Sequence, residues 1–194
     1  MQLFQTNNIR IGIFGGAYKW SEDNKLLAQK IGMIVALRKL TVVTGATTGI
    51  PYFAAQSAQK NGALVVGISP AQSAEQHCNL YHKPLDGCDF IVWTGSGYTG
   101  RNYLNVRNCD IAIFISGELG TLEEFCIACY EGKIIGIASG SGGITDLIPQ
   151  IVAKCQTQHG SSIVYSSDPE ELIEVCIQQY LAHSKLTRQK PISS

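Results

Sequence analysis

The chain has 194 residues, of which 45% are hydrophobic and 15% are charged, whereas charged residues make up about 25% of a typical soluble domain. This length predicts one domain spanning residues 1–194, with a polar C-terminal tail from about residue 184. Fifteen basic and fifteen acidic side chains give zero formal net charge, which disfavours nucleic acid as the main ligand. Because so few charges would leave much apolar surface exposed, we expect a homodimer or a larger homo-oligomer.

The sequence has no basic segment leading into a long apolar run, and no run approaches the roughly 18 apolar residues that cross a bilayer. We therefore expect a cytoplasmic protein with no signal peptide and no membrane contact. Seven scattered cysteines predict reduced thiols. Cys126 and Cys129 have the spacing of a redox pair, but we interpret both as small core residues of a helix. No metal or other cofactor is expected, because the four histidines are scattered and no short-spaced ligand set occurs.

Short apolar runs rich in β-branched residues alternate with longer amphipathic stretches, which is typical of an α/β protein with parallel strands joined by helices. We predict one mostly parallel sheet of about seven strands. In chain order they are Ile9–Phe14, Leu40–Thr44, Ala63–Ile68, Asp89–Thr94, Ile111–Ile115, Lys133–Ala138 and Ser162–Tyr165.

Two helices have clear start signals. Ser21 is a good N-cap, followed by acidic residues in the first turn and by an apolar face made of Leu27, Ile31, Ile34 and Val35. The run from Asp168 to Glu171 combines a cap, a proline at the first helical position and a glutamate three residues after the cap. The stretch from Ala71 to Gly87 is weakly patterned, and the helix before Asp110 is predicted to have about eight residues.

Glycine-rich loops follow four of the predicted strands. They contain Gly15-Gly16, Gly45 with Gly49, Gly95-Ser96-Gly97, and Gly117 to Thr121. Ligands of open parallel sheets bind at the carboxyl ends of the strands, where free amides at helix starts attract anions. These loops therefore predict an anionic ligand, although each glycine could equally serve a tight strand-to-helix turn.

The segment Gly95 to Gly100 matches the dinucleotide fingerprint, and Glu118 is an acidic residue at the end of the next strand. However, this loop follows the fourth strand, and the helix after it is short for the usual crossover. A nicotinamide dinucleotide is therefore disfavoured. Hydrolysis of ATP by a phosphate loop is also disfavoured, because the sequence contains no Gly-x-x-x-x-Gly-Lys-Ser/Thr.

The run from Gly117 to Glu124 resembles the Pro-Gly-Gly-x-Gly-Thr-x-x-Glu signature of the LONELY GUY (LOG) family, whose members are often labelled possible lysine decarboxylases. Gly45 to Gly49 resembles the earlier glycine loop of that family, and Arg101-Asn102 precede the fifth strand. With Gly15-Gly16, the similarity extends over roughly residues 9 to 180. It is nearest to a shorter branch of predicted Rossmann-fold nucleotide-binding proteins.

This resemblance implies a Rossmann-like three-layer fold, dimers, and hydrolysis of the N-glycosidic bond of a nucleoside 5′-monophosphate to free base and ribose 5-phosphate. The catalytic arginine and glutamate of the family fall on Arg101 and Glu124. A carboxylate at Glu124 would stabilise positive charge on the sugar and position water, although first-turn helix electrostatics is an alternative role. The residues expected to bind phosphate or nucleotide are Gly15, Gly16, Gly45, Gly49, Gly97, Asn102, Gly117, Glu118, Gly120 and Thr121.

The sequence departs from the family signature at Ser116-Gly117-Glu118, where the family has Pro-Gly-Gly, and at Gly100-Arg101-Asn102, where it has Glu-Arg-Lys. A carboxylate at Glu118 should repel a phosphate bound by the amides of Gly120 and Thr121. A non-catalytic nucleotide-binding or sensing module is therefore the main alternative. A weaker alternative is an accessory protein in DNA processing. Lysine decarboxylation is rejected, because pyridoxal phosphate has no recognisable lysine and acidic partner here.

Overall fold

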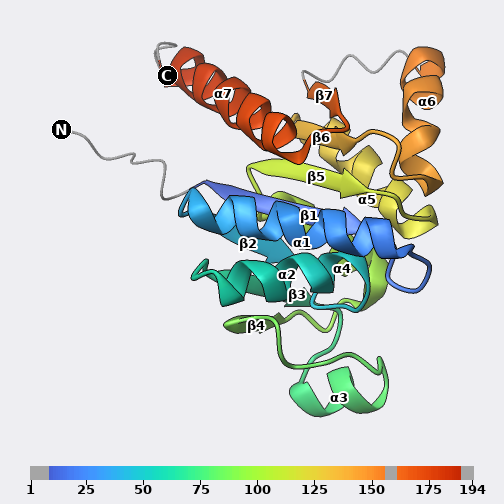
Figure 1. Ribbon diagram of the computed structural model, residues 1–194. Helices are drawn as coiled ribbons and strands as arrows, with labels where there is room; N and C mark the ends of the chain where they lie inside the picture. Colours follow the sequence, from blue (N-terminus) through green and yellow to red (C-terminus); the bar gives the residue numbers. More distant parts are fainter. Residues whose placement is uncertain (1–8, 156–160, 189–194) are drawn as a thin grey trace, which may run out of the picture.

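The computed structural model describes residues 9–155 and 161–188, which form an α/β fold around a seven-stranded parallel sheet (Figure 1). Every strand end lies within two residues of its predicted position, so the predicted fold class and strand count are confirmed. The strands are β1 (Arg10–Gly15), β2 (Thr41–Thr44), β3 (Val65–Ser69), β4 (Phe90–Trp93), β5 (Ile111–Ile115), β6 (Ile134–Ala138) and β7 (Ser162–Ser166).

The sheet has the order β4-β3-β2-β1-β5-β6-β7, and all neighbouring strands are parallel. The chain runs outward from β1 to β4 and then crosses back to place β5 on the other side of β1. The strand order therefore reverses between β1 and β5. At such a switch point the loops diverge to opposite faces and leave a crevice at the carboxyl ends of the strands.

Helices cover both faces of the sheet, which confirms the Rossmann-like three-layer arrangement (Figure 1). One face carries α1 (Glu22–Leu37), α2 (Ile50–Lys60) and α7 (Pro169–Arg188), and the other carries α4 (Gly97–Arg107), α5 (Leu119–Tyr130) and α6 (Ile148–Cys155). The short α3 (Ala74–Asn79) projects beyond β4, and a 3₁₀ turn, η2 (Gly143–Asp146), precedes α6.

The alternation of side chains along the central strands explains why both layers bind tightly to the sheet. In β5, Ile111, Ile113 and Ile115 face α1, α2 and α7, whereas Ala112 and Phe114 face the other layer. All five side chains are fully buried. A parallel sheet buried on both faces needs such a continuous apolar run, which is why its strands were readable from the sequence.

Both predicted helix caps are present. Ser21 Oγ accepts a hydrogen bond from Asn24 N at 3.1 Å, and Asp168 Oδ1 accepts one from Glu171 N at 2.9 Å. Because α7 extends to Arg188, the predicted polar tail is helical in its first residues. Since α4 has 11 residues, the prediction of about eight was too short.

Cys129 is buried as predicted, but Cys126 is exposed, because it lies on the outer side of α5. The expected absence of a signal peptide depends partly on residues 1–8, and these lie outside the described residues. None of the helices in the described part of the chain combines the length and apolar character needed to cross a membrane.

Candidate functional site

A pocket of about 230 Å³ lies at the carboxyl ends of β1, β2 and β5, at the switch point of the sheet. Most of the predicted site residues line it, although they come from four separate loops and helices. These are Gly15, Gly16, Gly45, Arg101, Asn102, Glu118, Gly120, Thr121 and Glu124. Parallel strands bring their carboxyl ends to one edge of the sheet, so the topology itself assembles this set.

Three predicted ligand-binding glycines, Gly49, Gly97 and Gly117, do not line the pocket, and each has positive φ. Gly49 starts α2 at φ 72°, where a Cβ would collide with the carbonyl oxygen of Gly16. Gly117 has φ 101°, and a Cβ there would collide with the Thr121 side chain. These positions thus serve the turns and close packing that position the pocket. Of the fingerprint segment from Gly95 to Gly100, Tyr98 lines the pocket and its glycines do not, which weakens a dinucleotide-binding role further.

Arg101 of α4 and Glu124 of α5 form a buried ion pair, with 3.6 Å between Arg101 Nη1 and Glu124 Oε1. Their side chains are only 8% and 9% exposed. Burial raises the pKa of Glu124 to about 7, although the charge of Arg101 acts in the opposite direction. Burial also lowers the pKa of Arg101. Since Arg101 Nε is buried with no hydrogen-bond partner, this arrangement is costly to fold and is typical of a functional site.

Gly45 explains how Arg101 enters the pocket. A Cβ at this position would overlap Arg101 Nη1 directly. The guanidinium therefore packs against the bare backbone after β2, where any other residue would displace it. The absence of a side chain at Gly45 is therefore needed for packing against Arg101, in addition to its predicted place beside a ligand.

Asn105, which the sequence reasoning missed, is buried one helical turn after Arg101 on α4. In one orientation of its amide, Nδ2 donates to Glu124 Oε1 at 3.5 Å. In the reverse orientation, Nδ2 donates to Thr44 O at 3.3 Å and Oδ1 accepts from Gly45 N at 3.2 Å. The reverse orientation satisfies more groups at shorter distances, so we favour it. The i, i+4 spacing from Arg101 was the available signal.

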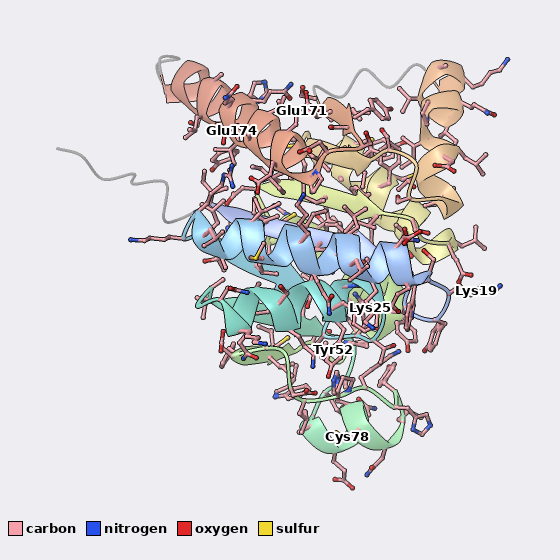
Figure 2. All side chains as sticks on the ribbon, in the orientation of Figure 1. Lys19, Lys25, Tyr52, Cys78, Glu171 and Glu174 are labelled. Carbon is pink, nitrogen blue, oxygen red and sulfur yellow. The ribbon has the colours of Figure 1, made fainter. Side chains whose placement is uncertain are left out.

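Glu118 occupies the N-cap position of α5 but accepts no capping hydrogen bond through its side chain. Its carboxylate pairs with Lys19 Nζ at 3.5 Å, and the side chain is 51% exposed. Lys19 lies on the loop between β1 and α1 (Figure 2). Glu118 has φ −129°, and the left-handed backbone lies one and two residues earlier, at Gly117 and at Ser116 with φ 53°. Replacement of glycine by glutamate therefore imposes no backbone strain at this position.

Ser116 keeps its unusual backbone because the loop after β6 holds it. Its backbone N donates to Ser141 Oγ at 2.8 Å, and Ser141 Oγ donates to Ala138 O at 2.7 Å. The start of α5 is thereby anchored to the neighbouring strand. Its first free amides, which include those of Gly120 and Thr121, are held in a fixed place at the pocket.

The other missed pocket residues include Tyr18, Tyr98 and Lys83. Lys83 follows α3, and its Nζ donates to Tyr18 Oη at 2.9 Å and to Thr48 Oγ1 at 3.2 Å. This lysine lies in the weakly patterned stretch from Ala71 to Gly87, so no periodicity or motif pointed to it. Within residues 9–155 and 161–188, no three or more His, Cys, Asp and Glu side chains are grouped so that they could hold a metal ion.

Solved structures share this fold over nearly all of the described chain. The X-ray structure of TM1055 superposes with a TM-score of 0.78 at 24% identity, covering 88% of this chain and 99% of that one. The molybdenum cofactor binding protein of the phototrophic bacterium Rippkaea orientalis has a TM-score of 0.71 at 26% identity, covering 90% and 98%. DNA processing protein A from Helicobacter pylori shares the fold alone. It has a TM-score of 0.61 at 17% identity, covering 89% of this chain and 81% of that one.

Sequence relatives agree with this placement. An uncharacterized protein of Archaeoglobus fulgidus is 28% identical over 169 residues, which cover 87% of this chain and 95% of that protein. The family model described as the SLOG cluster4 family matches residues 8–173. The resemblance to LOG proteins is therefore confirmed at the level of the superfamily, with a different family within it. The chain belongs to the SLOG cluster4 family.

Proposed function

We propose that this protein binds a phosphorylated heterocyclic small molecule of the nucleoside-monophosphate type in the pocket at the switch point. The observation that carries this proposal is the buried Arg101–Glu124 pair, with its unsatisfied Arg101 Nε, in the wall of a pocket made from glycine loops. A negatively charged ligand in this pocket would offset part of the cost of burying the Arg101 guanidinium. The volume of about 230 Å³ lies below the roughly 300–1,000 Å³ of drug-sized sites and favours a mononucleotide over a dinucleotide.

The backbone around Gly120 leaves room for a ligand. Nothing lies within 4 Å of the position that a Cβ would take there, so a ligand can approach the main chain. The protein from Rippkaea orientalis is described as binding molybdenum cofactor, which is a phosphorylated pterin. A nucleotide and a pterin phosphate share a flat nitrogen heterocycle and a phosphate group, so the same pocket chemistry suits both.

Hydrolysis of the N-glycosidic bond is a second candidate function, favoured by the position of Glu124 in the pocket beside Arg101. As a carboxylate, Glu124 would stabilise positive charge that develops on the sugar and would orient the attacking water. Its pKa of about 7 leaves a substantial fraction ionised at neutral pH. Arg101 would then hold an oxygen of the ribose or phosphate through its remaining donors.

The test starts with mass spectrometry of small molecules that co-purify with the full chain. Calorimetry and thermal unfolding then follow with a panel of nucleoside 5′-monophosphates, and ribose 5-phosphate is assayed in the same mixtures. A ligand at a free concentration of 100 times its Kd should raise the free energy of unfolding by about 2.7 kcal/mol. If no nucleotide or pterin phosphate either co-purifies or raises the unfolding temperature, the proposal is wrong.

The variant Glu124→Gln separates the two candidate functions, since it keeps the shape of the side chain and removes its charge. If the protein is a hydrolase, we expect loss of ribose 5-phosphate release by a factor of at least about 100, with AMP binding retained. If wild-type protein binds AMP and releases no ribose 5-phosphate, a carrier or sensing role is supported. Unchanged release by Glu124→Gln would contradict the catalytic assignment of this residue.

A further inference from the structure

Lys83 is a buried cation of the pocket, and within residues 9–155 and 161–188 no carboxylate forms an ion pair with it. The residue is 5% exposed, and in the described part of the chain its Nζ donates to two hydroxyl groups, Tyr18 Oη and Thr48 Oγ1. An ammonium group removed from water without a counter-charge is expensive. The ring of Tyr18, whose centroid lies 4.3 Å from Lys83 Nζ, offsets part of this cost, and an anion bound in the pocket would offset the rest.

The fold holds Lys83 in place through His77 of α3. Lys83 N donates to His77 O at 3.1 Å, and His77 Nε2 lies 3.0 Å from the carbonyl oxygen of Pro84. The other ring nitrogen, His77 Nδ1, lies 2.9 Å from Ser69 Oγ at the carboxyl end of β3. With Nε2 protonated, the imidazole joins the Lys83 segment to the sheet. The cation is thus preorganised before any ligand binds.

The remaining charges of the pocket lie toward α5 and already have partners. Glu124 pairs with Arg101, Glu118 pairs with Lys19, and Glu123 Oε2 accepts a hydrogen bond from Asn102 at 2.8 Å. The three carboxyl groups near the start of α5 outnumber their two cationic partners, Arg101 and Lys19, so that end is a poorer place for a phosphate than Lys83. By contrast, Thr48 lies two residues before the start of α2, where the helix dipole adds positive potential to that of Lys83.

We propose that Lys83 binds the phosphate of the ligand, with the hydroxyl groups of Tyr18 and Thr48 beside it, in place of the first amides of α5. This inference rests on the proposed function and adds the orientation of the ligand to it. The phosphate lies toward α2 and Lys83, and the sugar and heterocycle extend toward Arg101 and Glu124. A sugar hydroxyl there can donate to the carboxyl groups that would repel a phosphate.

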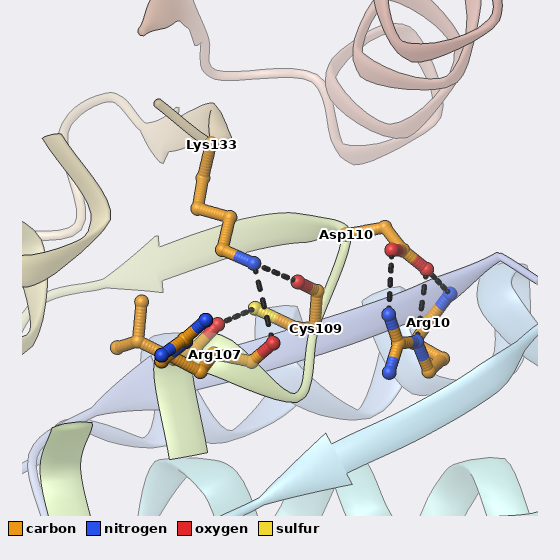
Figure 3. A network of polar contacts seen from close by, with 6 residues as sticks. Arg10, Arg107, Cys109, Asp110 and Lys133 are labelled. Atoms are coloured by element: carbon orange, nitrogen blue, oxygen red, sulfur yellow. Dashed lines mark hydrogen bonds and ion pairs between the residues drawn. The ribbon is translucent and has the colours of Figure 1, made fainter. Parts of the chain in front are cut away.

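The experiment compares AMP with adenosine by calorimetry, because the two differ only in the phosphate. Lys83→Met should weaken AMP binding by about tenfold or more, the loss expected for one charge-assisted hydrogen bond, and should leave adenosine binding unchanged. Lys83→Arg keeps the charge and should retain most of the preference for AMP. The matched control is Lys133→Met. Lys133 Nζ also donates to neutral oxygens, the backbone carbonyls of Cys109 at 2.6 Å and Arg107 at 3.3 Å, and it lies beyond the amino end of β5, away from the pocket (Figure 3).

A measurement on the wild-type protein covers the case in which Lys83→Met does not fold. The NMR signal of the Lys83 ammonium group should move on addition of AMP and stay in place on addition of adenosine. An AMP-to-adenosine preference that is equal in wild-type protein and Lys83→Met, or an unmoved ammonium signal with bound AMP, overturns this inference and leaves the proposed function intact. Failure of wild-type protein to bind any nucleotide or pterin phosphate overturns the proposed function itself.

Discussion

Glu124 is the residue whose protonation links the site to the stability of the fold. Burial raises its pKa from 4.5 to about 7, so between these pH values the folded protein binds more protons at this position than the unfolded chain does. Its contribution to the free energy of unfolding is therefore fully present below about pH 4.5 and is lost as the pH rises through about 7.

The first prediction is that Glu124→Gln removes this pH dependence. In wild-type protein without ligand, the contribution of Glu124 should fall across the window by on the order of 3 kcal/mol, from about 1.4 kcal/mol per pKa unit, whereas the glutamine variant should lack this component. Urea unfolding at several pH values from 4.5 to 8 measures the difference. Parallel curves for the two proteins would show that Glu124 titrates normally.

Glu118 provides the second prediction at the residue scale. From the sequence alone, Glu118→Gly should tighten nucleotide binding strongly, most of all at low salt, if the phosphate lies at the start of α5. Because Glu118 is half exposed and paired with Lys19, and because we place the phosphate at Lys83, we expect a gain in AMP affinity of less than about threefold, the scale of exposed ion pairs. A tenfold or greater gain in AMP affinity, measured by calorimetry, would indicate that the phosphate binds at the start of α5.

At the scale of elements, the close approach of α4 to the end of β2 depends on one glycine. The third prediction is that Gly45→Ala destabilises the protein by about 1–3 kcal/mol, the usual cost of overpacking, and weakens AMP binding, since the new methyl group would displace Arg101. Gly120→Ala is the control for stability, because its methyl group would meet no atom within 4 Å. Denaturant unfolding measures the stability of both variants. Equal unfolding midpoints for Gly45→Ala and Gly120→Ala would contradict the role given to Gly45.

At the scale of the whole molecule, β4 is an edge of the sheet with large apolar side chains exposed on it. Phe90 is 64% exposed, Val92 38% and Trp93 36%. Exposed apolar edge strands favour pairing with another chain. Together with the low charge content of the sequence, this edge supports the expectation that the protein self-associates.

The fourth prediction is therefore a dimer or larger oligomer at micromolar concentration, with Phe90→Lys shifting it toward the 21.0 kDa monomer and Leu37→Lys leaving it unchanged. Leu37 is equally exposed, at 68%, but lies at the end of α1. Sedimentation equilibrium measures the mass. A wild-type monomer would refute self-association, and dissociation by Leu37→Lys alone would place the contact on another face.

The sequence by itself determined the strand-helix alternation and most of one wall of the pocket. The strand Ile111–Ile115 is recognisable in the sequence as a continuous apolar run, because both faces of a parallel strand are buried. The motif from Gly117 to Glu124 is recognisable from the spacing of its own residues. Arg101 was found because it precedes the same strand. These signals lie within a few residues of one another, where short-range periodicity and helix-start chemistry act.

Only the tertiary structure decided which groups meet. The pairing of Glu118 with Lys19, the space that Gly45 leaves for Arg101, and the arrival of Lys83 beside Tyr18 and Thr48 all join segments distant in sequence. The reversal of strand order at β1 brings these loops to one edge, and the weakly patterned stretch that carries Lys83 is positioned by His77 rather than by its own propensities. Local sequence patterns specify the helices and strands. The charge balance of the pocket depends instead on the distances between side chains from different segments, and these distances are set only when the helices pack on the sheet.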